Sequence, residues 1–202
     1  MKTENVVLMK MARESLQGKW GLAIGTTVLF ILISVAMEIV AKFFPLSILL
    51  ALIISGPLEL GISIFFLALS RNQDARVEHL FKGFDNFFVA SGAYILIAVF
   101  TLLWSLLLII PGIIAALSYS MTFYILADDN SIRAMEAIDK SKEMMDGYKL
   151  KFFYLNLRFF GWALLCILTL GIGFLWLIPY VQVSVAKFYD DIKGNQMTVE
   201  NI

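Results

Sequence analysis

The chain has 202 residues, of which 60% are hydrophobic and 16% are charged, and its mean hydropathy is +0.83. Soluble domains carry roughly a quarter charged residues and under half apolar ones, so this composition excludes a water-soluble globule and indicates a membrane protein. Sixteen basic residues balance sixteen acidic ones, which argues against nucleic acid as a partner. With one histidine and one cysteine, we expect neither a His/Cys metal site nor a cofactor.

The first predicted element is a helix over residues 4–18, whose apolar residues recur on one face, as they do in helices that lie on a membrane surface. Membrane spans are predicted at 20–41 and 46–70, because each stretch is long enough to cross a bilayer. A GxxxG pattern at 21–25 predicts close packing against another helix. Pro57 lies inside the second span, where the missing backbone donor predicts a kink.

The second unit begins with an amphipathic helix over residues 71–85, again predicted to lie on the surface. Residues 86–129 then form one apolar run that is long enough for two spans. We place the turn between these spans near Trp104, because tryptophan favours the membrane interface. This choice puts Pro111 inside the fourth span, and a turn at 110–112 is the alternative.

The third unit begins with an amphipathic helix within residues 130–148. Spans five and six are predicted at 152–170 and 173–189, with Pro179 inside the last one, and the polar tail at 190–202 is predicted to be loose. The predicted fold class is therefore an all-α, six-span transmembrane bundle. It consists of three Pro-kinked helical hairpins, each preceded by an amphipathic surface helix.

These three units share a short pattern. In each, a glutamate and an apolar residue precede a glycine that has an aromatic residue nearby, and the glycines Gly18, Gly83 and Gly147 are 65 and 64 residues apart. Glycine ends a helix at its C-terminal side, and an aromatic side chain anchors the entry into lipid. We therefore expect a single domain, with pseudo-repeats at approximately 1–72, 73–129 and 130–202.

Basic residues mark one side of the predicted bundle. Of the sixteen lysines and arginines, only Lys42 lies in a turn between paired spans. Because cytoplasmic loops are rich in basic residues, both termini and all three surface helices are expected on the cytoplasmic side. The residues expected to contact anionic lipid headgroups are Arg76, Lys82, Lys140, Lys142, Arg158 and Lys187.

Glu59 lies about halfway through the second span. A charged group at the bilayer centre costs about 2.5–3.5 kcal/mol on insertion scales, so the side chain is expected to face protein or water. One hypothesis is a carboxylate that couples to a proton or a ligand, beside the proline kink. The alternative is a structural glutamate with hydrogen-bond partners among Ser63, Ser118, Ser120 and Gln182.

Two aspartate pairs, at 128–129 and 190–191, occupy equivalent ends of spans four and six. Carboxylate oxygens of this kind bind Mg²⁺ or Ca²⁺ when they meet in space, whereas such residues more often end or cap helices. No nucleophile motif, zinc motif or phosphate-binding loop is present. We therefore expect no catalytic residue and no metal ligand.

Several stretches match a known family: IPGIIAALSYSMTFYILADD (110–129), AMEAIDKSKEMMDGYK (134–149), GIGFLWLIPY (171–180) and AKFYDD (186–191), together with Gly56-Pro57-Leu58 and Gly61. In these the chain resembles bacterial integral-membrane proteins designated domain of unknown function 975. It departs from them at Ser131, where proline is frequent, and at Arg158, where a small polar residue is usual, which weakens Arg158 as a shared functional residue. The resemblance implies a multi-pass protein of the bacterial plasma membrane and names no activity.

The leading functional hypothesis is a non-enzymatic membrane scaffold whose basic surface helices hold anionic lipids. The first alternative is a small transporter or channel with a polar site at Glu59 in the middle of the membrane. The second alternative is a membrane-embedded, lipid-modifying enzyme at the paired aspartates. A protein partner or a second copy of the chain remains an open alternative for the scaffold.

Overall fold

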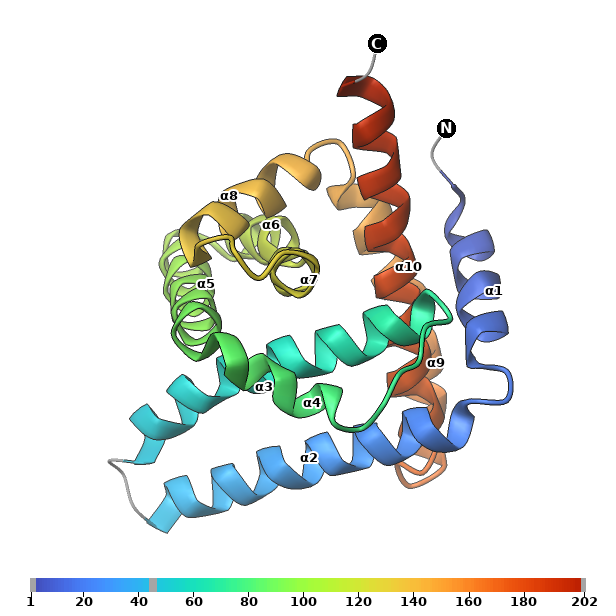
Figure 1. The fold of residues 1–202 in the computed structure, drawn as a ribbon, viewed down its shortest axis with the longest axis horizontal. Coiled ribbons are helices and arrows are strands. Elements are labelled where there is room, and N and C mark those ends of the chain that lie inside the picture. The colour runs from blue at the N-terminus through green and yellow to red at the C-terminus, as the bar shows by residue number, and fades with distance from the viewer. Residues whose placement is uncertain (1–2, 44–46, 201–202) are drawn as a thin grey trace.

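The computed structural model describes residues 3–43 and 47–200 of the chain. Every regular element in these two ranges is helical, which confirms the predicted all-α class. The elements are α1 (Asn5–Leu16), α2 (Trp20–Phe43), α3 (Ser47–Ser70), α4 (His79–Lys82), the 3-10 turn η1 (Gly83–Asn86), α5 (Phe87–Leu107), α6 (Ile109–Tyr119), α7 (Thr122–Asp128), α8 (Ala134–Met144), α9 (Lys149–Leu168) and α10 (Phe174–Glu200) (Figure 1).

Five helical stretches within the described residues are long and apolar enough to cross a membrane. They are α2, most of α3, the run from α4 to α5, the run from α6 to α7, and α9. The predicted sixth span, α10, is not among them. Its uncharged part, 174–186, is shorter than the roughly 17 residues that a span needs, because Lys187, Asp190 and Asp191 follow within the same helix.

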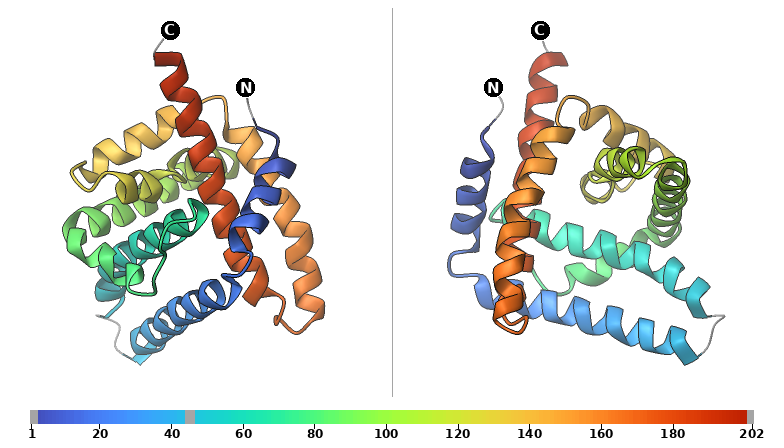
Figure 2. Two further views of the ribbon diagram at one scale, coloured as in Figure 1. Left: turned by 45° about the vertical axis from the view of Figure 1, so that its right-hand side comes forward. Right: turned by 180° about the vertical axis from the view of Figure 1, so that it is seen from behind.

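At the centre of the fold lies α3, which contacts α1, α2, α4, α5, α7 and α10. Half of its most apolar stretch is buried, compared with 17% in α2 and α9. Figures 1 and 2 show α2 beside α3, α9 beside α10, and α5 to α8 on the side of α3 away from α2. The outer helices expose large apolar side chains, including Leu32, Leu102 and Leu165, and a surface of this kind suits lipid rather than water.

Pro57 lies inside α3 and leaves the carbonyl of Ile53, one turn earlier, without its usual helical donor. The hydroxyl of Ser91 on α5 donates to that carbonyl oxygen over 2.6 Å. A backbone group that the proline frees is therefore satisfied by the neighbouring helix, as unpaired groups at membrane depth must be. Pro179 likewise lies inside α10, and the predicted kinks at both prolines stay predictions.

Three glycines let α3 touch its neighbours closely. A Cβ atom at Gly56 would lie 2.3 Å from the carbonyl oxygen of Ala90, and one at Gly61 would lie 1.9 Å from that of Leu80. Gly83 meets the carbonyl of Pro57 in the same way. The GxxxG pair of α2 behaves differently, because no atom lies within 4 Å of an added Cβ at either position. Its predicted packing against another helix of the chain is therefore wrong.

The predicted surface helix at 71–85 is mostly absent. Only α4 and η1 are helical there, and residues 73–76 are not. Asn72 adopts a left-handed conformation with φ of 56°, the amide of Gln73 bonds the carbonyl of Ala68, and that of Asn72 bonds Leu69. These bonds form the Schellman motif that ends a helix, so α3 stops at this point. The regularly spaced apolar residues that predicted a continuous helix at 71–85 therefore do not lie on one.

The other two predicted surface helices, α1 and α8, are present, and their apolar faces are covered by protein. Leu8 and Leu16 of α1 are buried, α1 packs on α10, and Ile138 of α8 is buried between α8 and its neighbours. Gly18 and Gly147 follow these helices with φ of 73° and 70°, a conformation that glycine adopts without strain. The prediction that glycine ends these helices is confirmed at both positions.

The turn between spans three and four lies at Leu108, between the two placements considered from the sequence. Pro111 consequently lies in the first turn of α6, where its missing N–H needs no partner, and the kink predicted there is wrong. The chain instead breaks its helix at Ser120 and Met121, between α6 and α7.

The C-terminal tail at 190–202, which was predicted to be loose, instead continues α10 as helix to Glu200.

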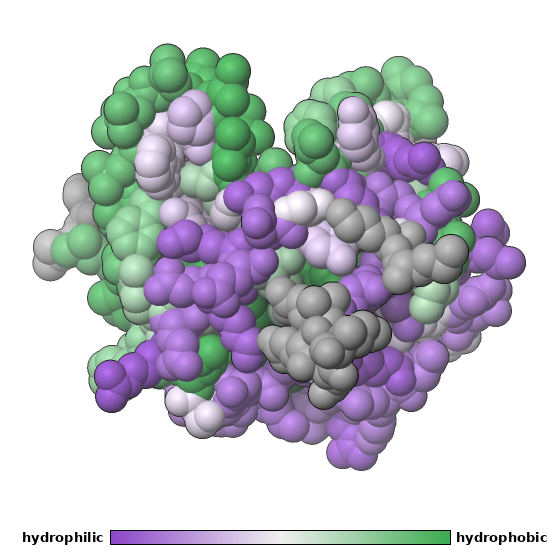
Figure 3. Space-filling model, turned by 90° about the horizontal axis from the view of Figure 1, so that it is seen from above, coloured by the Kyte–Doolittle hydropathy of each residue, from purple (hydrophilic) through white to green (hydrophobic). Residues whose placement is uncertain are grey.

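Both described chain ends lie on one side of the molecule (Figure 1). Figure 3 looks onto that side and shows hydrophilic residues across the middle and the lower part of the view, with hydrophobic residues along its upper and left edges. We call this side the polar face. The turns of the helix pairs α5–α6 and α9–α10 carry exposed apolar residues instead, such as Leu106 and Leu170.

Candidate functional site

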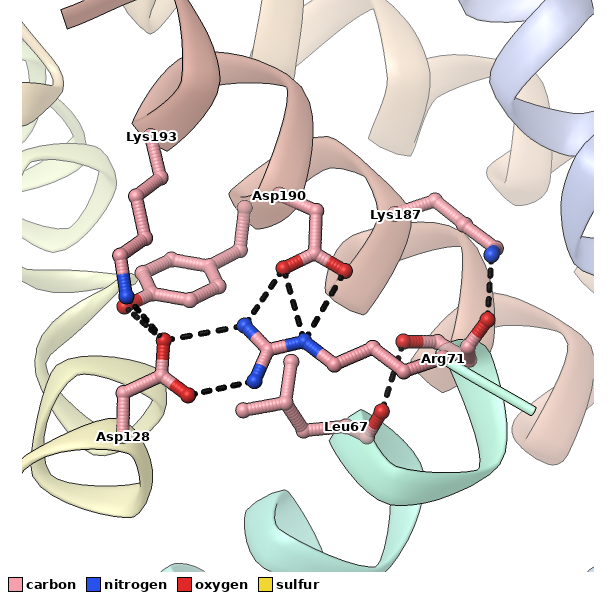
Figure 4. A network of polar contacts seen from close by, with 8 residues as sticks. Leu67, Arg71, Asp128, Lys187, Asp190 and Lys193 are labelled. Atoms are coloured by element: carbon pink, nitrogen blue, oxygen red, sulfur yellow. Dashed lines mark hydrogen bonds and ion pairs between the residues drawn. The ribbon is translucent and has the colours of Figure 1, made fainter. Parts of the chain in front are cut away.

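The ends of α3 and α7 meet the side of α10 at a cluster of charged residues, which we call the Arg71 cluster (Figure 4). Arg71 immediately follows α3, Asp128 ends α7, and α10 contributes Tyr189, Asp190 and Lys193. The Schellman motif after Ser70 turns the chain away, so the Arg71 side chain projects beyond α3 towards α7 and α10. The cluster thus joins parts of the chain that are 57 and 119 residues apart.

Arg71 is held by both aspartates. Its Nη1 and Nη2 atoms donate to the two oxygens of Asp128 over 2.6 and 2.9 Å, the bidentate geometry in which arginine recognises carboxylate. Its Nε and Nη2 atoms donate to Oδ1 of Asp190 over 3.1 and 2.7 Å. Asp128 also accepts from the Tyr189 hydroxyl, at 2.9 Å, and from Lys193, at 2.5 Å. Four of the five Arg71 donors are therefore committed to the aspartates.

Charges within the Arg71 cluster cancel, since two cations face two carboxylates. The hydrogen bond to Asp128 raises the pKa of the Arg71 guanidinium above its ordinary value, and the neighbouring Asp190 acts in the same direction. Part of each side chain stays accessible, with 28% of Arg71 and 13% of Asp128 exposed. The Arg71 cluster is therefore a network of ion pairs that remains partly accessible to water.

The paired aspartates take four different environments. Asp128 and Asp190 do meet in space, and a guanidinium lies between them. Asp129 accepts from the amide and hydroxyl of Ser131, and these bonds lower the pKa of its carboxyl. Asp191 pairs with Lys151 over 2.7 Å and accepts from the hydroxyl of Thr3. Among the described residues no group of three metal-ligating side chains occurs.

Glu59 lies halfway along α3 and is half-buried. Its carboxylate has no hydrogen bond or ion pair to any residue in the described ranges. The partners considered for it are engaged elsewhere: Ser118 and Ser120 donate to carbonyls of their own helix, and Gln182 accepts from Tyr124 over 3.1 Å. Ser63 is buried one turn further along α3, without a hydrogen bond to Glu59.

Two hollows open from Glu59. The larger, of about 700 Å³, lies between α5 and the α6–α7 run, and the smaller, of about 330 Å³, lies between α2 and α3. We call them the α5 hollow and the α2 hollow. Glu59 and Tyr94 line both of them, so these two side chains form the boundary between the hollows.

Both hollows carry polar side chains at helical spacing, on the side of Glu59 away from the polar face. The α5 hollow continues past Thr101 and Ser105 towards the turn at Leu108, and the hydroxyl oxygen of Thr101 is buried without a partner in the described residues. The α2 hollow continues past Ser34 to Glu38, near the end of α2. The α5 hollow therefore extends from Glu59 towards the end of α5, and the α2 hollow extends from Glu59 towards the end of α2.

The basic residues predicted to contact headgroups differ in their surroundings. Arg76 pairs with Asp74 and Lys142 pairs with Asp139, all four being exposed, while Lys187 donates to the carbonyl of Ser70. The remaining three are exposed and form no ion pair within the described residues. They are Lys82, Lys140 and Arg158.

Sequence reasoning missed Arg71, the residue that organises the cluster. A signal was present, because Arg71 ends the second helix of the first predicted unit, as the aspartate pairs end the corresponding helices of the other two. A cation at one end and carboxylates at two equivalent ends is the pattern of an interhelical ion pair. Assigning 71–85 to a surface helix hid this correspondence.

Comparison with protein families gives one identification. Residues 1–113 and 106–196 match the family described as "Protein of unknown function (DUF975)". The comparisons with curated proteins and with solved structures found no match. The matched ranges cover most of the chain, and the chain belongs to this family.

Proposed function

We propose that this protein is a small, non-enzymatic transporter or channel for a monovalent cation, with Glu59 as the binding carboxylate in the middle of the membrane. One observation carries the proposal: Glu59 lies in an apolar helix, has no partner among the described residues, and lines two hollows. Ionisable groups inside membrane helices mark ion or substrate pathways by default.

Access to Glu59 is from the side of the helix turns. The hydroxyls of Thr101 and Ser105 and the carboxylate of Glu38 lie along the two hollows and supply oxygen ligands to a hydrated cation. Neutral hydroxyls alternating with an acidic site are typical of cation pathways, in which binding must be weak enough to allow release.

On the other side of Glu59 the path is closed. Tyr124 is buried near Glu59, and its ring stacks on that of Tyr189, which bonds Asp128 of the Arg71 cluster. The cluster thus lies between Glu59 and the polar face. We propose that it forms the inner barrier, and that transport requires its ion pairs to separate.

The proposal includes six spans, with α10 as the sixth, in a bacterial plasma membrane. The position of both described chain ends on the polar face supports an even number of crossings (Figure 1). The concentration of basic residues on that face supports its assignment to the cytoplasm. In this arrangement each predicted pseudo-repeat supplies one helix to the Arg71 cluster, α3, α7 and α10 in turn.

Flux through the purified full chain in proteoliposomes tests the proposal. A monovalent cation gradient and an internal indicator dye report on the wild type, on Glu59→Gln, and on Glu78→Gln as an exposed control. We expect wild-type flux that Glu59→Gln abolishes and Glu78→Gln retains. Absence of wild-type flux for protons, Na⁺ and K⁺, or equal flux in the Glu59→Gln variant, contradicts the proposal.

A second function, a scaffold that holds anionic lipids, is favoured by Lys82, Lys140 and Arg158, which are exposed and without an ion pair in the described residues. It ranks second because Arg76, Lys142 and Lys187 already have protein partners. Under this function, reversing the charge of Lys82 and Lys140 weakens binding to anionic vesicles and Glu59→Gln has no effect.

A further inference from the structure

A third hollow, separate from Glu59, lies where the corner between α1 and α2 meets α9 and α10. Its volume is about 380 Å³, and it is lined by Arg13, Trp20, Trp162, Cys166, Trp176 and Tyr180, among others. We call it the tryptophan hollow. It holds three of the four tryptophans in the sequence. Its volume falls within the range of small-molecule sites, and its mostly apolar lining is typical of them.

The tryptophan hollow opens to the surface that faces lipid. Trp162 and Trp176 are 55% and 50% exposed, and they lie on α9 and in the uncharged first part of α10. Aromatic side chains of this kind combine a large apolar surface with a polar N–H and favour the membrane interface. A ligand therefore enters from the bilayer, and the walls suit a hydrocarbon chain.

Arg13 gives the tryptophan hollow its charge selectivity. It is exposed and forms no ion pair in the described residues. Lys10 precedes it by three positions on α1 and is also exposed, so the two cations share one side of the helix. A guanidinium repels a cationic ligand and binds phosphate through paired N–H groups.

We propose that the tryptophan hollow is a binding site for one anionic phospholipid of the phosphatidylglycerol class. The phosphate is held by Arg13, with Lys10 nearby, and one acyl chain lies against the walls formed by Trp20, Trp162 and Trp176. A zwitterionic lipid binds less tightly, because its own cation lies close to its phosphate and competes with Arg13. This site does not depend on the proposed function at Glu59.

Quenching of tryptophan fluorescence by brominated lipids tests the site. The full chain is reconstituted into vesicles that contain increasing fractions of brominated phosphatidylglycerol or brominated phosphatidylcholine, in unbrominated phosphatidylcholine. We expect quenching by phosphatidylglycerol to saturate at a low lipid fraction, and quenching by phosphatidylcholine to rise only in proportion to its fraction.

Two arginine variants, one at the rim of the hollow and one outside it, separate this site from general attraction to the polar face. Arg13→Gln is expected to raise the half-saturating fraction of phosphatidylglycerol about tenfold, as loss of a hydrogen bond to a charged group does. Arg76→Gln removes another exposed arginine, which does not line the hollow, and is expected to leave the curve unchanged. Because Arg13 is exposed, its replacement leaves the fold intact.

A third variant tests whether the tryptophan walls of the hollow contribute to binding. Trp176→Leu is expected to weaken saturable quenching and to lower its amplitude, with Arg13 still present. Identical curves for the two brominated lipids in the wild type overturn the proposal, as does an Arg13→Gln curve that coincides with that of the wild type. Equal weakening by Arg13→Gln and Arg76→Gln also overturns it, because attraction would then be spread over the whole basic surface.

Discussion

The rings of Tyr124 and Tyr189 stack with centroids 5.7 Å apart and planes 25° apart. Tyr124 donates to Gln182, and Tyr189 donates to Asp128. The stack therefore ties α7 to α10 between the middle of α3 and the Arg71 cluster. The contact has two separable parts, the apolar stack and the hydroxyl bond to a carboxylate.

Replacing Tyr189 by phenylalanine keeps the stack and removes the bond to Asp128. We expect a loss of about 1.5 kcal/mol in the free energy of unfolding, at the low end for hydrogen bonds to charged groups because Asp128 keeps its bonds to Arg71 and Lys193. Tyr189→Ala removes the buried ring as well and is expected to cost about 3–5 kcal/mol. Thermal unfolding in detergent measures the loss of stability in both variants, and Tyr154→Phe, at an exposed position, is the control. Equal losses of stability in the two Tyr189 variants would show that the ring stack contributes nothing.

Arg71→Ala leaves two aspartates facing each other, Asp128 at the end of α7 and Asp190 within α10. Breaking a buried ion pair costs about 3–5 kcal/mol, and since Arg71 is 28% exposed we expect about 2 kcal/mol after allowance for solvent screening. Arg71→Lys is expected to recover only part of this, because an ammonium cannot form the bidentate contact.

The control for Arg71 is Arg76→Ala, which breaks an exposed pair with Asp74 and is expected to leave thermal stability unchanged. The raised pKa of Arg71 means that its contribution to stability is complete at every pH below the strongly alkaline range in which arginine ordinarily titrates. It is lost only as pH rises beyond that. The difference between wild type and Arg71→Ala should therefore stay constant between pH 7 and pH 9, and a difference that disappears over this range would contradict the assignment.

The Arg71 cluster also shows what the sequence could predict. Hydropathy and helix length located five of the six predicted spans as membrane-length helices, because these signals are local. The aspartate pairs at the ends of predicted spans four and six were recognised from the sequence as candidate sites. Arg71 was not, because its partners are 57 and 119 residues away and no local pattern records which helix ends meet.

Two further errors have local causes. The helix predicted at 71–85 fails because Asn72 takes the left-handed conformation and the Schellman bonds end α3; hydrophobic spacing carries no information about such an ending. The tail after 189 was expected to be loose because it is polar, yet Asp190 and Lys193 bind other elements. These polar residues lie within α10, where their ion pairs to Arg71 and Asp128 hold the helix against other elements.

Ser91 and Pro57 offer a double-mutant test of how the proline is tolerated. Ser91→Ala alone leaves the Ile53 carbonyl without a donor and is expected to cost about 1–2 kcal/mol. In the Pro57→Ala background, the new N–H of residue 57 bonds that carbonyl as in an ordinary helix, so Ser91→Ala should cost almost nothing. Unfolding in detergent of the two single variants and the double variant gives the coupling, and additive effects would mean that the Ser91 bond is unrelated to the proline.

Two glycine-to-alanine variants compare a close helix contact of α3 with the open surface of α2. Gly61→Ala places a methyl group where 1.9 Å separates it from the Leu80 carbonyl, whereas Gly25→Ala on α2 adds one with no atom within 4 Å. Backbone cannot move aside as a flexible side chain can, so Gly61→Ala is expected to force α3 and α4 apart and to cost about 3 kcal/mol, at the upper end for overpacking. Gly25→Ala is expected to be neutral or slightly stabilising, because alanine favours helix. Size-exclusion recovery after a series of heating steps ranks the two variants against wild type. A Gly25→Ala variant that is the less stable of the two would mean that the GxxxG face of α2 is packed after all, against another copy of the chain.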